Sequence, residues 1–419
     1  MSSDGGCTDR RTAADGVADA CAPRLARRVV SLGVEAAFEV LGRARALEAQ
    51  GRDIVHLEAG EPDIATPPHI IEAGVRAMRN GETRYTPSPG TAELRSAVAE
   101  SLPARGVHAA PENVVITPGS KLLLFHALHA LLEPGDDVLV PDPGYPAYAS
   151  VTAFIGARPI GYPVDAACAD GLDVEALATL ITPRTRALVL NSPHNPTGTT
   201  VGHAALERIA ELARRHDLML ISDEIYGRLT FGAEAAESVA ALPGMAARTV
   251  IVDGFSKAYA MTGWRLGYGV MPVPVARAVA KLVNNSAACT PGFVQAAGVA
   301  ALRGPQDSVS ALVCALRTKR DRIVAGLNAL SGVTCPLPGG AFYAFPDVTD
   351  ALARMDLTAG ALAERLLVDH GVACLPGSAF GVGAERRLRF SYATSLASID
   401  TALDRLRPAV GVPQDGPPR

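Results

Sequence analysis

The sequence predicts an α/β fold in which helices cover a mostly parallel sheet, with a smaller α+β unit beside it. Short apolar runs typical of buried strands recur between residues 113 and 253, and helical stretches and turn residues separate them. Strands that are apolar throughout and alternate with helices are typical of a covered parallel sheet. After residue 305 the pattern changes to shorter strand-like runs mixed with helices. The two patterns therefore predict two structural units.

The predicted elements follow one another in a simple order. The first is a helix over 34–50, because apolar residues recur there at helical spacing and Gly51 supplies a stop. The strands of the large unit are expected at NVVIT (113–117), DVLVP (137–141), ALVLN (187–191), LMLIS (218–222) and TVIVD (249–253), with helices over 121–132 and 204–216. The second unit is expected to hold helices over 309–330, 359–370 and 399–406, and strands at AFYAF, VACLP and LRFSY.

Composition and charge exclude several classes of function. The 39 basic residues against 43 acidic ones give a net charge of −4, so we expect neither nucleic acid nor a membrane as a partner. Seven cysteines are scattered without a C-x-x-C pair, and no apolar stretch has the length of a membrane span or a secretory signal. These features predict a protein of the reducing cytoplasm. His126 and His129 share a helix face without a third ligand at metal spacing, so we expect no metal site.

Polar motifs follow three consecutive strand-like runs. The segment SPHNPTG begins at Ser192, DEIY begins at Asp223, and GFSK ends at Lys257, with Arg265 closing the nearby GWR. Ligands of open α/β sheets bind beyond the carboxyl ends of the strands, so these motifs are the first place to look for chemistry. Each motif alone has a structural explanation: Asp223 as a helix cap, Lys257 as a loop lysine, and the Asn-Pro-Thr-Gly segment as a turn.

Taken together and in this order, the motifs resemble the fold type I pyridoxal-phosphate enzymes, specifically the aspartate aminotransferase family. The resemblance extends over about 34–406, and further matches are LEAGEPDIATP, RYTPSPGTAELR, ITPGSK, DPGYPAY, PGSAFG and LRFSYATS. It implies a large domain with a seven-stranded, mostly parallel sheet and a small α+β domain. The expected division is a flexible extension (1–28), a first part of the small domain (29–60), the large cofactor-binding domain (61–304), the rest of the small domain (305–407) and a flexible tail (408–419).

The resemblance implies that the cofactor is pyridoxal 5'-phosphate, which acts as an electron sink in amino-acid chemistry. Lys257 is the candidate for the Schiff base with the cofactor and for proton transfer afterwards. Asp223 is the candidate for the pyridine nitrogen, because a buried carboxylate favours its protonated form. Tyr226 and Asn195 match the residues that bond to the phenolic oxygen.

The cofactor's phosphate needs hydrogen-bond donors and positive charge. The motif PGSK precedes a helical stretch, so the backbone N–H groups of Gly119, Ser120 and Lys121 are expected at a helix N-terminus, where the helix dipole is positive. Ser256 and Arg265 are expected to complete the site, since a guanidinium presents a fixed fork of donors.

Two tyrosines have roles that only the resemblance implies. Tyr85 matches a tyrosine that reaches the phosphate of the neighbouring subunit, so the resemblance implies a homodimer with shared active sites. Tyr145 stands where the family stacks an aromatic ring on the cofactor. That residue is commonly tryptophan, and the tyrosine keeps a π-face.

Substrate recognition is expected to begin at the α-carboxylate. Arg389 matches the arginine that grips this group with two parallel hydrogen bonds, and Asn195 and the backbone of Gly60 are expected to assist.

The side chain of the substrate is harder to assign. Lys121 matches a lysine that meets the distal carboxylate of acidic substrates, but Glu35, Ala36 and Ala37 replace the small hydroxyl residues that accompany it. Three interpretations of Glu35 are open: it repels a dicarboxylate, it neutralises Lys121, or it attracts a cationic side chain. A fourth is that Glu35 simply faces solvent. The segment 284–295 has no basic residue to bind a second carboxylate.

The resemblance implies a transaminase that moves an amino group from an L-amino acid, with a lean towards aspartate or glutamate, to a 2-oxo acid such as 2-oxoglutarate. One alternative is a β-lyase or a related specialised biosynthetic enzyme that uses the same cofactor. Another is a cofactor-sensing regulator, which is disfavoured because residues 1–28 are too short for a winged-helix reader. Neither G-x-x-x-x-G-K-[ST] nor G-x-S-x-G occurs, which argues against the usual nucleotide-binding and serine-hydrolase classes.

Overall fold

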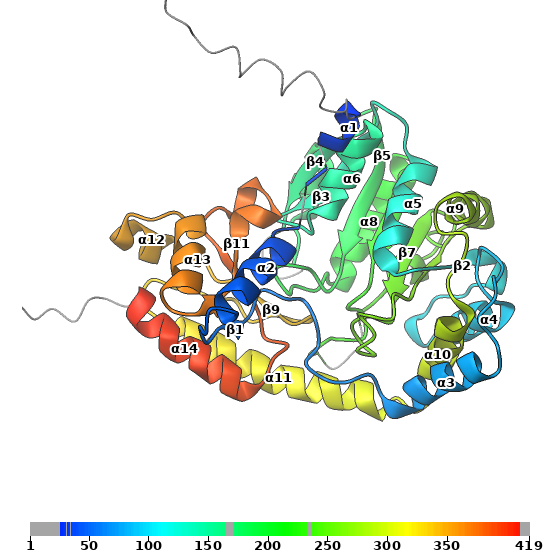
Figure 1. Ribbon diagram of the computed structural model, residues 1–419. Helices are drawn as coiled ribbons and strands as arrows, with labels where there is room; N and C mark the ends of the chain where they lie inside the picture. The colour runs from blue at the N-terminus through cyan, green and yellow to red at the C-terminus, as the bar shows by residue number, and fades with distance from the viewer. Residues whose placement is uncertain (1–25, 31, 34, 165–170, 233–235, 411–419) are drawn as a thin grey trace, which may run out of the picture.

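The computed structural model describes residues 26–410, except 31, 34, 165–170 and 233–235 (Figure 1). Most of the predicted N-terminal extension (1–25) and the end of the predicted tail (411–419) lie outside the described residues. The last helix, α14 (Leu396–Val410), runs three residues into the predicted tail. It does so because Ala409 and Val410 are buried in the core.

The large sheet has seven strands in the order β2-β8-β7-β6-β5-β3-β4. All pairs are parallel except those of β8, which runs antiparallel to both β2 and β7. The strands are β2 (Val114–Thr117), β3 (Asp137–Asp142), β4 (Arg158–Pro163), β5 (Thr185–Asn191), β6 (Met219–Asp223), β7 (Thr249–Gly254) and β8 (Gly267–Val270). The predicted mostly parallel, seven-stranded sheet is therefore confirmed.

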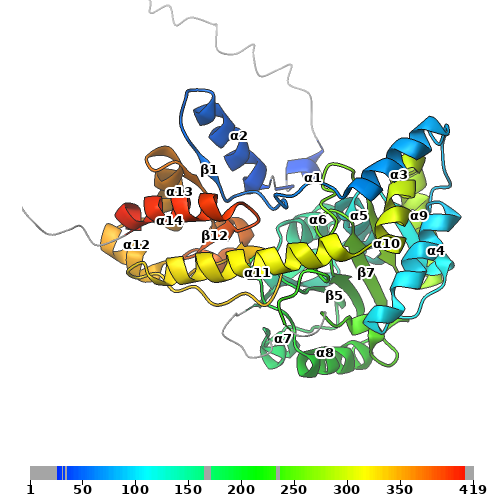
Figure 2. The same cartoon turned by 90° about the horizontal axis from the view of Figure 1, so that it is seen from below.

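Helices bury both faces of this sheet, which explains why its strands are apolar throughout. Val138 and Val140 of β3 face a cluster with α5 and α9, whereas Leu139 between them faces a second cluster with α7 and α8. Figure 2 shows these two helix layers on opposite sides of the sheet. The helices of the two layers are α5 (Ser120–Leu131), α6 (Ala147–Ile155) and α9 (Val273–Ser286), and α7 (Val174–Thr179) and α8 (His203–Arg215).

Sequence patterns did not predict two strands of the large sheet. β4, at one edge, contains two prolines and a glycine, and edge strands tolerate proline because one side of their backbone is unpaired. β8 carries two glycines in four residues although it is central. A Cβ on Gly267 would lie 2.3 Å from the backbone nitrogen of Ser120, so this strand needs glycine where α5 begins.

The second unit combines both ends of the chain. Its sheets are the antiparallel β11-β12-β9 and the parallel pair β1-β10, in which Val55 faces Val372. The strands are β1 (Val55–His56), β9 (Tyr343–Ala344), β10 (Val372–Ala373), β11 (Leu375–Pro376) and β12 (Leu388–Ser391), and the helices are α2 (Ala36–Glu48), α11 (Asp307–Asn328), α12 (Thr349–Met355), α13 (Ala359–Val368) and α14. The single strand predicted at VACLP is thus two strands in two different sheets.

The first predicted helix is shorter and more exposed than its periodicity indicates. α2 begins at Ala36, after Glu35 in an extended conformation, and ends at Glu48. Only Ala44 is fully buried, and Phe38 is 64% exposed. α2 lies between the two units (Figure 1), where part of its apolar face borders a pocket instead of the core.

Long helices connect the remaining parts. α11 spans 22 residues and runs from the second unit towards the large one in both views. The other elements are α1 (Arg27–Val30), α3 (Pro68–Arg79), α4 (Ala92–Ser101) and α10 (Gly292–Arg303), with short 3₁₀ turns at Pro103–Arg105, Pro111–Asn113, Val239–Ala241, Gly377–Phe380 and Val382–Ala384. Within the described part of the chain, every helix is too short or too polar to cross a bilayer.

The contact between Gly267 and the start of α5 makes a stability prediction. Gly267→Ala should destabilise the protein by about 1–3 kcal/mol or more, because the added methyl group overlaps backbone atoms that cannot move independently. Chemical denaturation of the two proteins measures the difference. Gly42→Ala in α2 is the matched control, since no atom lies within 4 Å of the new methyl group and alanine favours a helix. Equal stability of the Gly267→Ala variant and the unmodified protein would contradict the prediction.

Candidate active site

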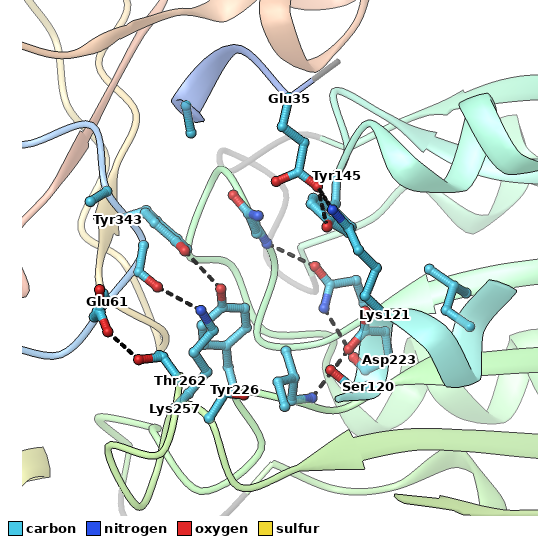
Figure 3. A pocket seen from close by; sticks show the side chains of 18 of the residues that line it. Glu35, Glu61, Ser120, Lys121, Tyr145, Asp223, Tyr226, Lys257, Thr262 and Tyr343 are labelled. Atoms are coloured by element: carbon cyan, nitrogen blue, oxygen red, sulfur yellow. Dashed lines mark hydrogen bonds and ion pairs between the residues drawn. The ribbon is translucent and has the colours of Figure 1, made fainter. Parts of the chain in front are cut away.

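A pocket of about 560 Å³ opens where the carboxyl ends of β5, β6 and β7 meet α2 and the second unit. Figure 3 shows side chains from both units pointing into it. Eleven of the predicted site residues line the pocket: Gly60, Ser120, Lys121, Tyr145, Asn195, Asp223, Tyr226, Ser256, Lys257, Arg265 and Arg389. The fold therefore brings together residues that are up to 329 positions apart in sequence.

Lys257 follows β7 and extends its amine across the pocket. Its Nζ donates a hydrogen bond to the carbonyl oxygen of Gly60 at 2.5 Å. Desolvation lowers the pKa of Lys257 to about 8, and the positive charge of Arg389 acts in the same direction. The neutral, nucleophilic form of the amine is therefore far more populated near neutral pH than in an ordinary lysine.

Asp223 ends β6 and is buried on the pocket floor. Its Oδ2 accepts a hydrogen bond from the Tyr148 hydroxyl at 2.7 Å, and its Oδ1 accepts one from the Ile225 backbone N–H at 3.2 Å. Burial nevertheless raises the pKa of Asp223 to about 6, because these two bonds offset only part of the desolvation cost. Asn191 Nδ2 binds the Asp223 carbonyl at 3.0 Å and fixes the strand end.

Two tyrosines form a buried pair beside the lysine. The hydroxyls of Tyr226 and Tyr343 lie 2.7 Å apart. The Tyr343 hydroxyl also lies 2.3 Å from where a Cβ on Gly60 would stand, so position 60 has no room for a side chain. The pair connects the large unit to β9 of the second unit.

Arg389 lies in β12, 4% exposed, with its guanidinium between two aromatic rings. Its centre is 4.4 Å from the ring centroid of Tyr343 and 4.8 Å from that of Phe380. Nη1 donates to Asn195 Oδ1 at 3.1 Å and Nη2 donates to the Glu58 carbonyl at 2.6 Å, whereas Nε has no partner among the described residues. This buried cation borders the pocket with capacity for an anionic ligand.

Hydrogen-bond donors lie at the N-terminus of α5, on another wall of the pocket than Arg389. Gly119 has a positive φ of +89°, and a Cβ there would lie 2.2 Å from Arg265 Nη2. Arg265 itself has a φ of +56°, and its Nη1 donates to the Thr262 carbonyl at 2.9 Å. The glycine thus lets the guanidinium approach the helix terminus closely, and the two together favour an anion.

Glu35, Lys121 and Tyr145 form one cluster. Glu35 Oε1 accepts a hydrogen bond from the Tyr145 hydroxyl at 2.5 Å and pairs with the Lys121 amine. Lys121 Nζ also lies 5.8 Å from the centroid of the Tyr145 ring. Of the interpretations left open for Glu35, the solvent-facing one is wrong, and the structure shows the ion pair with Lys121.

One predicted site residue lies elsewhere. Tyr85 is 91% exposed and does not line the pocket of its own protomer.

The two histidines that share a helix face have ordinary hydrogen-bond partners. His126 contacts Ser286 Oγ at 2.9 Å, and His129 contacts the Phe125 carbonyl at 2.8 Å. Among the residues that the structure describes, no group of three or more histidine, cysteine, aspartate or glutamate side chains is placed to hold a metal ion.

Sequence reasoning missed five polar residues of the pocket: Glu61, Tyr148, Asn191, Thr262 and Tyr343. Two of them had usable signals. Asn191 is the last residue of an apolar strand, where this fold places its ligands, and Tyr148 follows Tyr145 by one helical turn. Tyr343 gave no such signal, because a tyrosine within AFYAF is indistinguishable from a core aromatic.

Comparison with known proteins places this pocket in context. Residues 52–406 match the family described as aminotransferase class I and II. An aspartate aminotransferase of Musicola paradisiaca is 37% identical over 92% of this chain and 96% of its own. The structure of an aspartate aminotransferase from Thermus thermophilus with maleate has a TM-score of 0.87 at 37% identity, over 93% of this chain and all of the other. An alanine aminotransferase from Pyrococcus furiosus has a TM-score of 0.85 at 31% identity, over 92% and 99%. The chain belongs to the class I and II aminotransferases, a family of pyridoxal-phosphate-dependent enzymes.

Proposed function

We propose that this aminotransferase transfers the amino group of an L-amino acid to a 2-oxo acid through Lys257. The observation that carries the proposal is the meeting of three groups in one pocket. These are an amine with a pKa lowered to about 8, a buried carboxylate with a raised pKa, and a buried arginine that borders the pocket. An amino acid offers its own amine and carboxylate to such a site.

The pocket fits pyridoxal phosphate. Asp223 has hydrogen bonds from Tyr148 and Ile225 but no cationic partner within the described residues, so a protonated pyridine nitrogen would supply its missing counter-charge. At the other wall, the N-terminus of α5 with Ser256 and Arg265 offers donors to a phosphate. When bound, pyridoxal phosphate supplies the electron sink that stabilises negative charge at the substrate's Cα.

The side chains have distinct tasks in this proposal. Lys257 would hold the cofactor covalently through its neutral amine, and the released amine would carry the proton that leaves the substrate's Cα. Tyr226 and Asn195 are proposed to bond to the phenolic oxygen, and Tyr145 to lie against the cofactor ring. Arg389, stacked between its two aromatic rings, holds the α-carboxylate and so orients Cα towards the lysine.

The donor side chain is the finer part of the proposal. The acidic donor expected from Lys121 is supported by relatives named aspartate aminotransferases. The ion pair between Glu35 and Lys121 counts against it. Another protein of this fold is named an alanine aminotransferase, so such a framework also occurs with a neutral donor in the name. The donor is therefore proposed here as an L-amino acid, without a preference for an acidic side chain.

We also propose a homodimer in which Tyr85 reaches the partner's phosphate site. The exposure of Tyr85, outside the pocket of its own protomer, supports this assignment. A cytoplasmic location is proposed on the four described cysteines, which are all unpaired.

The role of Lys257 can be tested by substitution. Lys257→Ala should retain the fold, measured by circular dichroism, and lose turnover by several orders of magnitude, because both the covalent attachment and the proton transfer need its amine. Lys281→Ala, on the exposed side of α9, is the matched control and should keep its turnover.

Near-normal turnover of the Lys257→Ala variant would refute the assignment.

The cofactor spectrum during titration with single amino acids, without a 2-oxo acid, separates a transaminase from a β-lyase. A transaminase converts the cofactor to its amino form. A β-lyase instead releases pyruvate and ammonia from a β-substituted amino acid and leaves the cofactor spectrum unchanged at the end.

The lowered pKa of Lys257 predicts a pH dependence. Covalent attachment of pyridoxal phosphate to the cofactor-free protein should accelerate as pH rises and level off above about pH 8, because only the neutral amine attacks an aldehyde. Stopped-flow absorption measures this rate. Arg389→Met should move the midpoint to higher pH, since it removes a positive charge that lowers the pKa of Lys257. A midpoint near the ordinary lysine value of 10.5 in the unmodified protein would contradict the prediction.

A further inference from the structure

The far end of the pocket holds an acidic and a basic side chain that bind each other. Figure 3 shows Glu35 at the side opposite Lys257, with its carboxylate next to Lys121 and Tyr145. One carboxylate oxygen, Oε1, makes both contacts. The Glu35 side chain is 22% exposed and the Lys121 side chain 51% exposed, so a ligand in the pocket can reach the pair.

Lys121 is the one cation of the described pocket lining without another task. The lining contains four basic side chains, and we have assigned Lys257 to the cofactor, Arg265 to its phosphate and Arg389 to the α-carboxylate. Within one protomer, a second carboxylate on a substrate would therefore have to bind Lys121. Glu35 already occupies that amine with a carboxylate of the protein itself.

An acidic substrate side chain has two ways to reach Lys121, and both are unfavourable. It can displace Glu35, which then loses its bonds to both Lys121 and Tyr145. It can instead lie beside Glu35, where two like charges repel each other. An uncharged side chain has neither cost, and the pocket lining also includes the apolar side chains of Phe38 and Leu41 on α2.

The position of Glu35 also favours a fixed carboxylate. Glu35 immediately precedes α2 with an extended backbone, and its hydrogen bond from Tyr145 joins it to the large unit. A carboxylate held by two partners loses little further freedom when a ligand arrives. The Glu35 carboxylate therefore competes with a substrate carboxylate for the Lys121 amine.

We propose that Glu35 is a specificity-determining residue that selects against substrates with a second carboxylate. The donors of this enzyme are accordingly L-amino acids whose side chains carry no negative charge. This inference rests on the proposed function for the place of the substrate, since it puts the α-carboxylate at Arg389. It reverses the acidic preference that Lys121 alone predicts.

The test compares two unreactive carboxylates on the enzyme loaded with pyridoxal phosphate. Succinate and butyrate have the same number of carbons and differ in the second carboxylate. Titration calorimetry gives their dissociation constants for the unmodified protein and for Glu35→Gln, which keeps the shape of the side chain and removes its charge. The ratio of succinate affinity to butyrate affinity should rise about tenfold or more in the variant, because a neighbouring charge shifts such an equilibrium by that order.

Two further variants make the result specific. Glu61→Gln removes a negative charge from the same pocket, on the side of Thr262, and should change the ratio less than about twofold. Adding Lys121→Met to Glu35→Gln should abolish the gain, because the released amine is then absent. A general loss of fold in Glu35→Gln would weaken both ligands together and leave the ratio near that of the unmodified protein.

The inference is overturned if the ratio is unchanged in a Glu35→Gln variant that still binds butyrate as the unmodified protein does, if neither protein binds succinate measurably, or if Glu61→Gln raises the ratio as much. The failure of the proposed function would be visible separately. In that case no amino acid would change the absorption of the bound cofactor in the unmodified protein, whereas the succinate-to-butyrate ratio does not depend on turnover.

Discussion

A cluster of three acidic residues at the ends of β6 and β7 is the constraint on which the pocket depends. Asp223, Glu224 and Asp253 are all buried, and buried like charges destabilise a fold unless they are compensated. Arg105 pairs with Glu224 and Asp253, Ser222 and Ser238 donate to Glu224, and Tyr268 donates to Asp253. Among the described residues, the hydrogen-bond donors to Asp223 are neutral. The negative charges of Glu224 and Asp253 are thus compensated by Arg105, whereas the charge of Asp223, on the pocket side, is not. Of the three acids, Asp223 is the one without a cationic partner in the described part of the chain, and it faces the proposed cofactor position.

The second unit supplies the groups that the large sheet lacks. Arg389 comes from β12 and its partner carbonyl from Glu58, just after β1. The carbonyl of Gly60 meets the lysine that follows β7. Chemistry at the strand ends and recognition of the carboxylate are therefore assigned to different units, and the Tyr226–Tyr343 pair links them. The relative placement of the two units sets the distance between the Lys257 amine and Arg389, the proposed anchor of the substrate.

The fold class followed from local pattern, whereas most of the pocket residues were identified from motifs whose order resembles that of a known family. Buried strands are recognisable by three or four apolar residues in a row, and polar residues at strand ends identify the ligand edge. β8 was missed because its glycines are required by distant neighbours, Gly267 by the backbone at the start of α5 and Gly269 by the Leu123 side chain, which no local pattern reveals. Tyr343 was missed because its role depends on Tyr226, 117 residues away. The pairing of Glu35 with Lys121 needed coordinates for the same reason, since either residue alone is compatible with several functions.

The parallel pair β1-β10 also has a consequence for how the protein is made. Val55 pairs with Val372, so a strand near the beginning of the chain has its partner more than three hundred residues later. During synthesis, which runs at about 5–20 residues per second, the first strand leaves the ribosome long before its partner exists. The large sheet has all its strands between Val114 and Val270, so it can assemble while β1 and α2 are still without partners. In the growing chain, the apolar side chains of α2 and β1 have to stay exposed until the C-terminal segment arrives. This segment of the nascent enzyme is where a chaperone would find its longest-lived binding site.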